Sequence, residues 1–316
     1  MSKKLNRRGF LKKSAQYGVS AVAGSSLVTS ILGKSYLYAA GASAPDIAVV
    51  SGQDYAASTA KAIELLGGIS KFVPKNSRVA LLPNTQSKHP GTYTKPEILR
   101  AVIRMCKEAG AKEVNCLSWL TQKHWDSTGM AAAIAAEGAS LKLIPREEAY
   151  FQVVPVPKGK ALKEAKILKE FYSHDVFIDM PITKDHAGNK FTGTMKNLMG
   201  LNFPEINRTF HTGDFKEKPD DVEHLDQCIA DLNTVIKPTL LVVDATEFIT
   251  TNGPFGPGQL AKPLKVVAGV DRIAVDGYCT TLWGMKPEDI VMIKRGYEHG
   301  LGEIDLKKVQ IRELSL

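Results

Sequence analysis

Apolar runs and helical periodicity alternate along most of the chain. Short runs rich in Val, Ile and Leu, such as 79–82 and 176–180, are typical of buried strands. Between such runs, apolar residues recur at helical spacing, as at Ile98, Val102 and Met105. The pattern predicts strands over residues 79–82, 112–117, 141–144, 150–157, 176–180, 239–243, 264–268 and 272–275. It predicts helices from Lys95 to a stop at Gly110 and over residues 130–137, 162–172, 221–235, 277–282 and 288–299.

Strands and helices that follow one another in this order predict an α/β fold. Such alternation is typical of a mostly parallel sheet whose crossover connections are right-handed. We therefore expect a mostly parallel sheet with helices on both faces. An arrangement in two lobes around a cleft stays open.

The first 42 residues differ from the rest of the chain. Residues 6–12, NRRGFLK, resemble the twin-arginine export signal, in which paired arginines precede a large apolar residue. The segment 15–33 is rich in Gly, Ser and Ala, which makes it too weakly hydrophobic for a membrane span. We expect cleavage after Ala42, with an uncleaved anchor as the alternative. The resemblance implies a signal segment at 1–42, an α/β domain at 45–316, recognition by the twin-arginine export machinery, and a periplasmic or otherwise exported location.

The basic character of the chain comes mostly from this segment. Seven of the 41 Lys and Arg residues lie in residues 1–42, which contain no acidic residue. Without them the formal net charge falls from +8 to +1. A nearly neutral domain of about 270 residues has no electrostatic footprint for nucleic acid, and we expect no nucleic-acid partner.

The cysteines exclude the commonest cluster sites. The four of them lie far apart and form no C-x-x-C pair, so a ferredoxin-type iron–sulfur cluster or an ordinary structural zinc site is not expected. Each lies in an apolar pattern, which favours buried free thiols. They are Cys106, Cys116, Cys228 and Cys279.

The densest group of candidate functional residues follows the predicted strand at 176–180. Polar residues released at the carboxyl end of such a strand are where open α/β sheets build ligand sites. Two ammonium groups, two imidazoles and an amide suit a small anionic ligand, a carboxylate or a phosphate, better than a bare divalent metal. Only the histidines could ligate a transition metal. The group consists of Lys184, His186, Lys196, Asn197 and His211.

Each member of this group also has a plain structural interpretation. Lys196 and Asn197 could lie on the surface and at a helix cap, and a lone histidine is more often a hydrogen-bonding residue than a catalyst. Asp244, at the end of the strand 239–243, could orient a lysine or histidine, or cap a turn. For Asp276 we expect capping of a helix that begins at Gly277.

A second strand end could contribute to the same site. Asn84 follows the strand 79–82. It would face the same cleft if the strands 79–82 and 176–180 are neighbours in the sheet. The glycine and proline loop at 253–258 lacks the ending of a phosphate-binding loop, and we expect it to shape a pocket wall.

Several short motifs together resemble one protein family. They are 183–186 (TKDH), 192–200 (TGTMKNLMG), His211, 243–244 (VD), 253–254 (GP) and 268–276 (AGVDRIAVD). Through these motifs the chain resembles the domain-of-unknown-function family 362, from about Val79 to the C-terminus. Some members of that family carry ferredoxin-type cysteine motifs, which this chain lacks, and Leu82 stands where a lysine is usual. The resemblance implies no assigned activity.

A second resemblance is to nickel-pincer lactate racemases. The intervals between His186, Lys196 and His211 match those of a histidine, a lysine and a histidine in those enzymes. The resemblance implies a lysine that holds the cofactor covalently and histidines that serve as acid, base and metal ligand. A transition metal would then be bound, with His186 and His211 as its candidate ligands.

Three hypotheses about function follow. In an enzyme, His186 and His211 would be acid and base groups or metal ligands, Lys196 an electrostatic or covalent anchor, and Asp244 an orienting carboxylate. Lys184 and Asn197 would bind the ligand. The second hypothesis is a non-catalytic periplasmic binding or accessory protein with a redox partner, and the third is a racemase or epimerase with a metal cofactor. The cofactor itself is not identified by the sequence.

Overall fold

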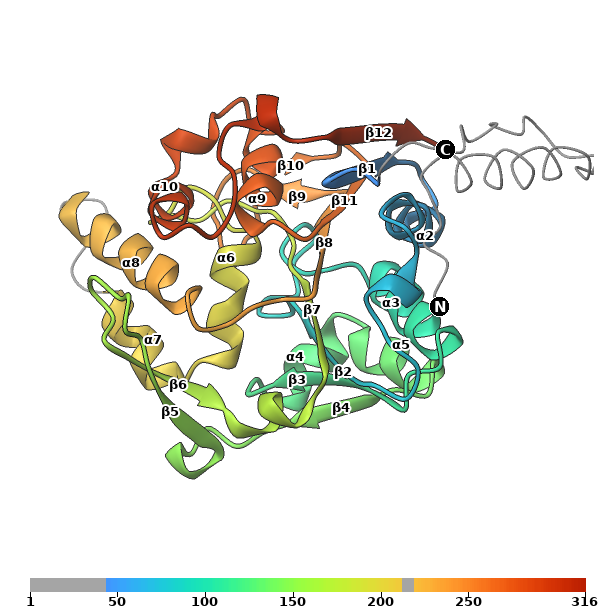
Figure 1. The fold of residues 1–316 in the computed structure, drawn as a ribbon, viewed down its shortest axis with the longest axis horizontal. Helices are drawn as coiled ribbons and strands as arrows, with labels where there is room; N and C mark the ends of the chain where they lie inside the picture. Colours follow the sequence, from blue (N-terminus) through green and yellow to red (C-terminus); the bar gives the residue numbers. More distant parts are fainter. Residues whose placement is uncertain (1–43, 212–218) are drawn as a thin grey trace, which may run out of the picture. The chain divides into compact units, whose positions relative to one another are not determined.

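The computed structural model describes residues 44–211 and 219–316, and the fold is organised around one eight-stranded sheet (Figure 1). Among its strands only β11 runs opposite to the others, so the sheet is mostly parallel as predicted. In spatial order the strands are β12 (Ile311–Ser315), β1 (Ile47–Ser51), β11 (Lys265–Gly269), β8 (Leu240–Ala245), β7 (Val176–Met180), β2 (Arg78–Pro83), β3 (Glu113–Ser118) and β4 (Ser140–Leu143).

Helices cover both faces of this sheet. Successive strand residues point to opposite faces, so Val79 and Leu81 of β2 join one hydrophobic cluster, while Ala80 and Leu82 join another. The first cluster is covered by α2 (Tyr55–Leu65), α3 (Pro96–Glu108), α4 (Gln122–Ser127) and α5 (Met130–Ala136). The second is covered by α6 (Thr194–Asn197), α7 (Pro204–Phe210), α8 (Pro219–Leu232), α9 (Arg272–Thr281) and α10 (Val291–Glu298). The prediction of helices on both faces is confirmed.

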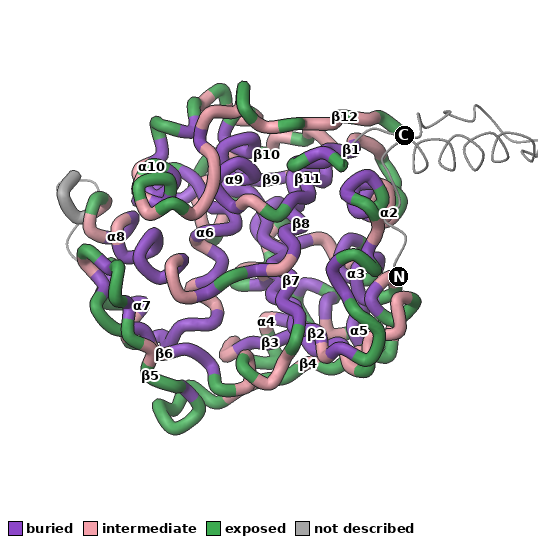
Figure 2. Tube along the Cα trace, in the orientation of Figure 1, coloured by how far each residue is buried: buried purple, intermediate pink, exposed green. Residues whose placement is uncertain are grey.

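The buried residues concentrate between these layers, and the strands at the centre of the sheet are buried along most of their length (Figure 2). Residues Ser43–Leu316 form one compact unit, so the two lobes left open by the sequence are not separate units. The predicted signal segment at 1–42 lies outside the described residues. Within the described parts of the chain, no helix has the length and apolarity that a membrane span requires.

Smaller elements lie beside the main sheet. Two antiparallel ribbons are formed by β5 (Phe151–Pro155) with β6 (Glu164–Leu168) and by β9 (Phe248–Ile249) with β10 (Leu260–Ala261). Short 3-10 helices span Ile69–Lys71, Glu148–Tyr150, Lys169–Ser173, Leu198–Leu201, Pro287–Asp289 and Leu306–Lys308.

Two predicted elements have the wrong type. The charged helix predicted over 162–172 is instead β6 followed by a 3-10 turn, because Ala165 and Ile167 are buried at the two-residue period of a strand that pairs with β5. The strand predicted over 272–275 is the first turn of α9. Asp271 caps it by accepting from the backbone N–H groups of Ile273 (2.9 Å) and Ala274 (3.0 Å).

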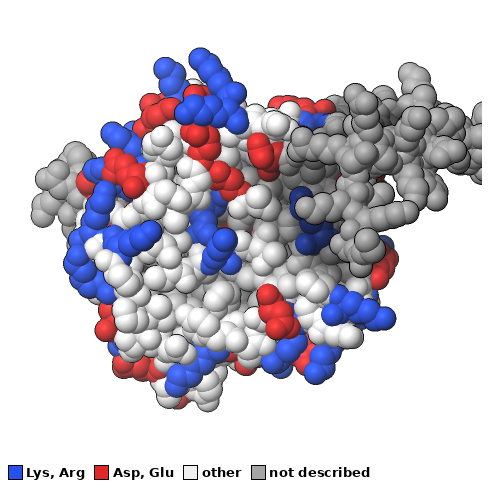
Figure 3. All heavy atoms as spheres, viewed as in Figure 1, with Lys and Arg blue, Asp and Glu red and all other residues white. Residues whose placement is uncertain are grey.

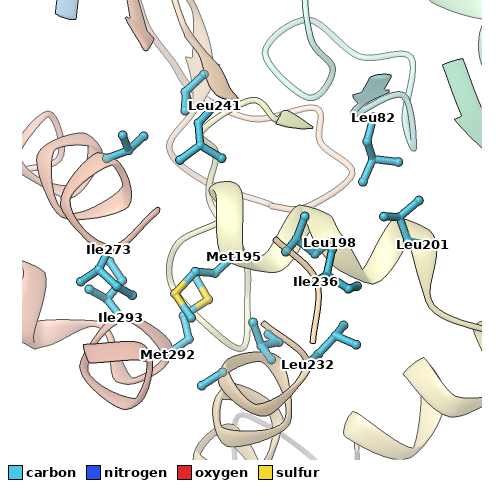
Figure 4. Packing of buried hydrophobic residues seen from close by; sticks show 14 of the residues in the cluster. Leu82, Met195, Leu198, Leu201, Leu232, Ile236, Leu241, Ile273, Met292 and Ile293 are labelled. Carbon is cyan, nitrogen blue, oxygen red and sulfur yellow. The ribbon is translucent and has the colours of Figure 1, made fainter. Parts of the chain in front are cut away.

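The short helix α6 is held by tertiary packing. Four residues are too few for a stable helix on their own. Met195 of α6 and Leu198, which follows it, are fully buried against Leu232, Ile273 and residues of α10 (Figure 4). Each such buried side chain contributes about 1.5–3 kcal/mol relative to an exposed position. This packing fixes the segment that carries Lys196 and Asn197.

Candidate functional site

A cleft of about 770 Å³ opens at the carboxyl ends of three parallel strands. Its lining includes the last residues of β2 and β3 and the segments that follow β7. This is the edge of an open α/β sheet where ligand sites form. The five residues predicted from the segment after β7 all line this cleft: Lys184, His186, Lys196, Asn197 and His211.

Lys184 is almost completely buried in the wall of the cleft. Only 1% of its surface is exposed, and its amine donates hydrogen bonds to Asn84 Oδ1 (3.1 Å) and the carbonyl oxygen of Thr92 (2.7 Å). Burial, together with the positive charge of Lys196, lowers the pKa of Lys184 to about 7. The amine is therefore divided between its charged and neutral forms near neutral pH.

An amide chain links this lysine to the interior of the sheet. Asn84 donates to Asn197 Oδ1 (3.1 Å), and Asn197 in turn donates to Asp179 Oδ1 (2.7 Å) and the carbonyl oxygen of Leu82 (2.8 Å). β2 and β7 are neighbours, so Asn84 does face the predicted site. Asp179 is fully buried, and desolvation raises its pKa well above the ordinary range of a carboxyl group.

The two histidines have opposite hydrogen-bonding roles. Nδ1 of His186 accepts from the backbone N–H of Gly188 (3.2 Å), so the proton of the neutral ring is assigned to Nε2. Nδ1 of His211 lies 2.9 Å from the carbonyl oxygen of Asn207, which assigns its proton to Nδ1 and leaves Nε2 as the acceptor nitrogen. Burial is the main cause that lowers the pKa of both rings, of His186 to about 2. Their ring centroids lie 6.3 Å apart.

Lys196 differs from Lys184 in what its amine contacts. Among the described residues the amine has one contact within hydrogen-bonding range, the thioether sulfur of Met199 at 3.8 Å. A thioether is a weak acceptor. Burial lowers the pKa of Lys196, and the negative charge of Asp226 opposes this shift.

A buried carboxylate sets the position of α6. Asp276 accepts from the backbone N–H groups of Thr194 (2.7 Å) and Met195 (3.0 Å), so it caps α6 and not the helix expected to begin at Gly277. This contact requires glycine at position 193, because a Cβ there would lie 2.4 Å from Asp276 Oδ1. The close approach of Asp276 to the start of α6 thus explains the glycine in the sequence TGTMKN.

Asp244 is absent from the described residues that line the cleft. Its fully buried carboxylate accepts from the backbone N–H groups of Lys95 (2.8 Å) and Thr246 (2.9 Å) and from Thr246 Oγ1 (2.6 Å). These contacts join the end of β8 to the start of α3. They fit the capping interpretation that the sequence left open, and the role of an orienting carboxylate stays a prediction.

The sequence missed several lining residues. Arg146 follows β4, and its guanidinium lies 4.8 Å from the ring centroid of Trp119, which follows β3. Both could have been found from the rule that named the other site residues, because both follow the carboxyl ends of strands. Arg208 and His124 lie on helices and Phe255 on the glycine and proline loop, which does form part of the cleft wall.

The lining of the cleft has one sign of charge. Its described residues include two lysines, two arginines and three histidines, and none of them is an Asp or Glu. The outer surface differs, because basic and acidic side chains are interspersed on the face that Figure 3 presents.

The described residues do not form a site for a bare metal ion. They contain no group of three or more His, Cys, Asp or Glu side chains that could hold one. His186 Nε2 carries a proton while Gly188 donates to Nδ1, so of this pair only His211 presents an acceptor Nε2. A transition metal here would need its other ligands from a bound cofactor. The racemase hypothesis stays a prediction.

Comparison with known proteins gives both sequence and structural likenesses. The thylakoid-associated protein sll1697 of Synechocystis sp. is 26% identical over 243 residues, which cover 74% of this chain and 71% of that protein. The lactate racemase apoprotein from Thermoanaerobacterium thermosaccharolyticum has a TM-score of 0.47 at 12% identity, covering 75% of this chain and 56% of that one. A crystal structure of a Thermotoga maritima protein has a TM-score of 0.42 at 12% identity, covering 78% and 60%. The chain thus spans less than two thirds of either solved protein.

A family model supplies the assignment. The model described as domain of unknown function (DUF362) matches residues 79–281, which is more than half of the chain. The matched range contains the strand ends, α6 and the lysines and histidines of the cleft. The chain belongs to the DUF362 family.

Proposed function

We propose that the cleft binds a small anionic ligand, a carboxylate or a phosphate. The observation that carries this proposal is the charge of the lining, which combines four Lys and Arg side chains with three histidines and includes no Asp or Glu among its described residues. A ligand carboxylate or phosphate would pair with these donors by charge-assisted hydrogen bonds, which are stronger than neutral ones. Within the cleft, low local dielectric strengthens such pairs.

The histidines add a capacity for proton transfer to this binding site. In the assigned tautomers, His186 would donate through Nε2–H, while Nε2 of His211 would accept. A ligand that contacts both rings would meet a hydrogen-bond donor on His186, whose low pKa keeps its ring neutral, and a proton acceptor on His211. We therefore propose general-base catalysis on the bound anion, with His186 as a hydrogen-bond donor, as the enzymatic form of this function.

The anion site is tested by calorimetry at fixed pH and ionic strength with oxalate, acetate and inorganic phosphate. We expect saturable binding of at least one of them. Lys196→Gln should weaken it about tenfold to a hundredfold, because one charge-assisted contact is lost. Lys190→Gln serves as the matched control, since this exposed lysine lies on the loop that precedes α6 but not in the lining. Equal losses in both variants, or no binding by the unaltered protein, would reject the site.

A non-catalytic accessory protein is the second candidate function. The observation that favours it is the 26% identity to a protein named as thylakoid-associated. On this proposal the cleft binds its anion without turnover, and the protein serves a membrane or redox complex. Incubating the protein with isotopically labelled ligand separates the two candidates, since only an enzyme exchanges solvent hydrogen or alters the ligand.

A further inference from the structure

We propose that Lys196 forms an imine with an anionic carbonyl compound, a 2-oxocarboxylate, bound in the cleft. The inference rests on the anion site proposed above and adds the substrate class and a covalent step to it. It begins from the difference between the two lysines that line the cleft.

Lys184 is poorly placed to be a nucleophile, because its amine already donates to Asn84 Oδ1 and to the carbonyl oxygen of Thr92. Moving the amine would leave the buried carbonyl without this donor. Lys196 has no such partner among the described residues, since its contact is the Met199 sulfur at 3.8 Å. Its amine can therefore reach a ligand without breaking a strong hydrogen bond.

The backbone beneath Lys196 is fixed although its amine is not. Asp276 holds the start of α6 through two N–H groups, and Met195 is fully buried beside it. Asn197, the next residue, is tied to Asp179 and the Leu82 carbonyl. A nucleophile on such a support is held near its reaction geometry, which is how positioning lowers a barrier.

The electrostatics allow this step without choosing between the two lysines, because burial lowers the pKa of Lys184 to about 7 and that of Lys196 to about 8. An amine attacks a carbonyl only when it is neutral, and burial lowers the pKa of Lys196 so that more of the amine is neutral near pH 7 than for an exposed lysine. The lining cations would hold the carboxylate of a 2-oxocarboxylate, which places its adjacent carbonyl inside the cleft.

The step balances without an oxidant or a reductant. The lysine nitrogen forms a bond to the carbonyl carbon, and the carbonyl oxygen takes a proton to give a carbinolamine. This intermediate then loses its hydroxyl group and one nitrogen proton as water, and the C=N bond forms. His186 Nε2–H lines the same cleft and can donate a hydrogen bond to the departing hydroxyl. The proton that this hydroxyl takes up comes from solvent water, to which the nitrogen proton is returned.

The test is reductive trapping on the full chain. The protein is incubated with pyruvate or glyoxylate and sodium cyanoborohydride, which reduces an imine to a stable secondary amine, and is then digested for peptide mass mapping. We expect the Lys196 peptide to gain the mass of the acid less one oxygen atom. Lys196→Arg should lose the adduct, and the exposed-lysine control Lys190→Arg should keep it. Thermal unfolding checks that both variants fold.

Separate outcomes identify which proposal fails. Oxalate carries two carboxylates and no ketone or aldehyde carbonyl, so calorimetry of oxalate on the unaltered protein reports the anion site alone. Oxalate binding without a trapped adduct would overturn the imine and leave the anion site standing. An adduct spread over exposed lysines, or one that persists in Lys196→Arg, would also overturn the assignment. Absence of both binding and trapping would reject both proposals.

Discussion

Asp179 shows at the scale of one residue how the site depends on groups behind its lining. Its Oδ1 accepts from Asn197, while its Oδ2 has no hydrogen-bond partner among the described residues. Desolvation raises its pKa, which shifts the carboxyl towards its neutral form. A neutral carboxyl can hold Asn197 without placing a negative charge beside an anion site.

This predicts an unusual effect of Asp179→Asn. Because the folded pKa of Asp179 is raised, the stability that its proton supports is present below the unfolded pKa and is lost as pH rises through the folded pKa. Asparagine keeps an acceptor oxygen and cannot ionise. The free energy of unfolding of Asp179→Asn should therefore increase relative to the unaltered protein as pH rises, in urea titrations from pH 5 to pH 8.

Two comparison variants make this measurement specific. Asp179→Ala removes the acceptor of Asn197 and should cost about 1–3 kcal/mol. The exposed Asp126→Asn should leave the pH dependence unchanged. A constant difference between Asp179→Asn and the unaltered protein across this pH range would show that the carboxyl does not titrate there.

At the scale of elements, α6 is both packed into the core and part of the candidate site. Its four residues stay helical because Asp276 caps them and because Met195 is buried between α8, α9 and α10. The same helix carries Lys196 and Asn197 to the cleft. Displacement of its start would therefore alter the site before it unfolds the protein.

Gly193→Ala tests this coupling. The added Cβ would meet Asp276 Oδ1 at 2.4 Å, so the cap must shift, at a cost of about 1–3 kcal/mol in the free energy of unfolding. We expect oxalate affinity to fall more than tenfold in calorimetry at a temperature where the variant is folded. Gly52→Ala is the contrast, because its Cβ would meet Ser58 Oγ at 2.9 Å and Gly52 does not line the cleft. Similar oxalate affinities in both variants would show that displacement of the Asp276 cap does not alter the site.

The elements that the sequence predicted best are those whose pattern agrees with their environment. The strand predicted at 176–180 has five buried residues. The polar residues predicted after it line the same cleft, because parallel strands end at one edge of the sheet. Residues 272–275 contain apolar β-branched side chains that favour a strand, yet the cap at Asp271 and burial on all sides make a helix. Arg208 was missed because its approach to the cleft depends on where α7 packs.

At the scale of the whole molecule, charge distinguishes residues 1–42 from the rest of the chain. Residues 1–42 contain seven of the 41 basic residues, and the remainder is close to neutral. The face that Figure 3 presents mixes side chains of both signs, while the cleft has only cationic and neutral lining residues among those described. A local field of one sign in a nearly neutral molecule favours small anions over extended polyanions.

The export proposal is tested by replacing Arg7 and Arg8 together with lysine. The double variant keeps every charge of the segment, so a general basic helix would function unchanged, whereas a twin-arginine signal should fail and the protein should remain in the cytoplasm. Cell fractionation measures the distribution. The mass of the exported protein should place its first residue at Ser43, as cleavage after Ala42 requires. A double variant that is exported and processed like the unaltered chain would contradict the assignment of residues 1–42 as a twin-arginine signal.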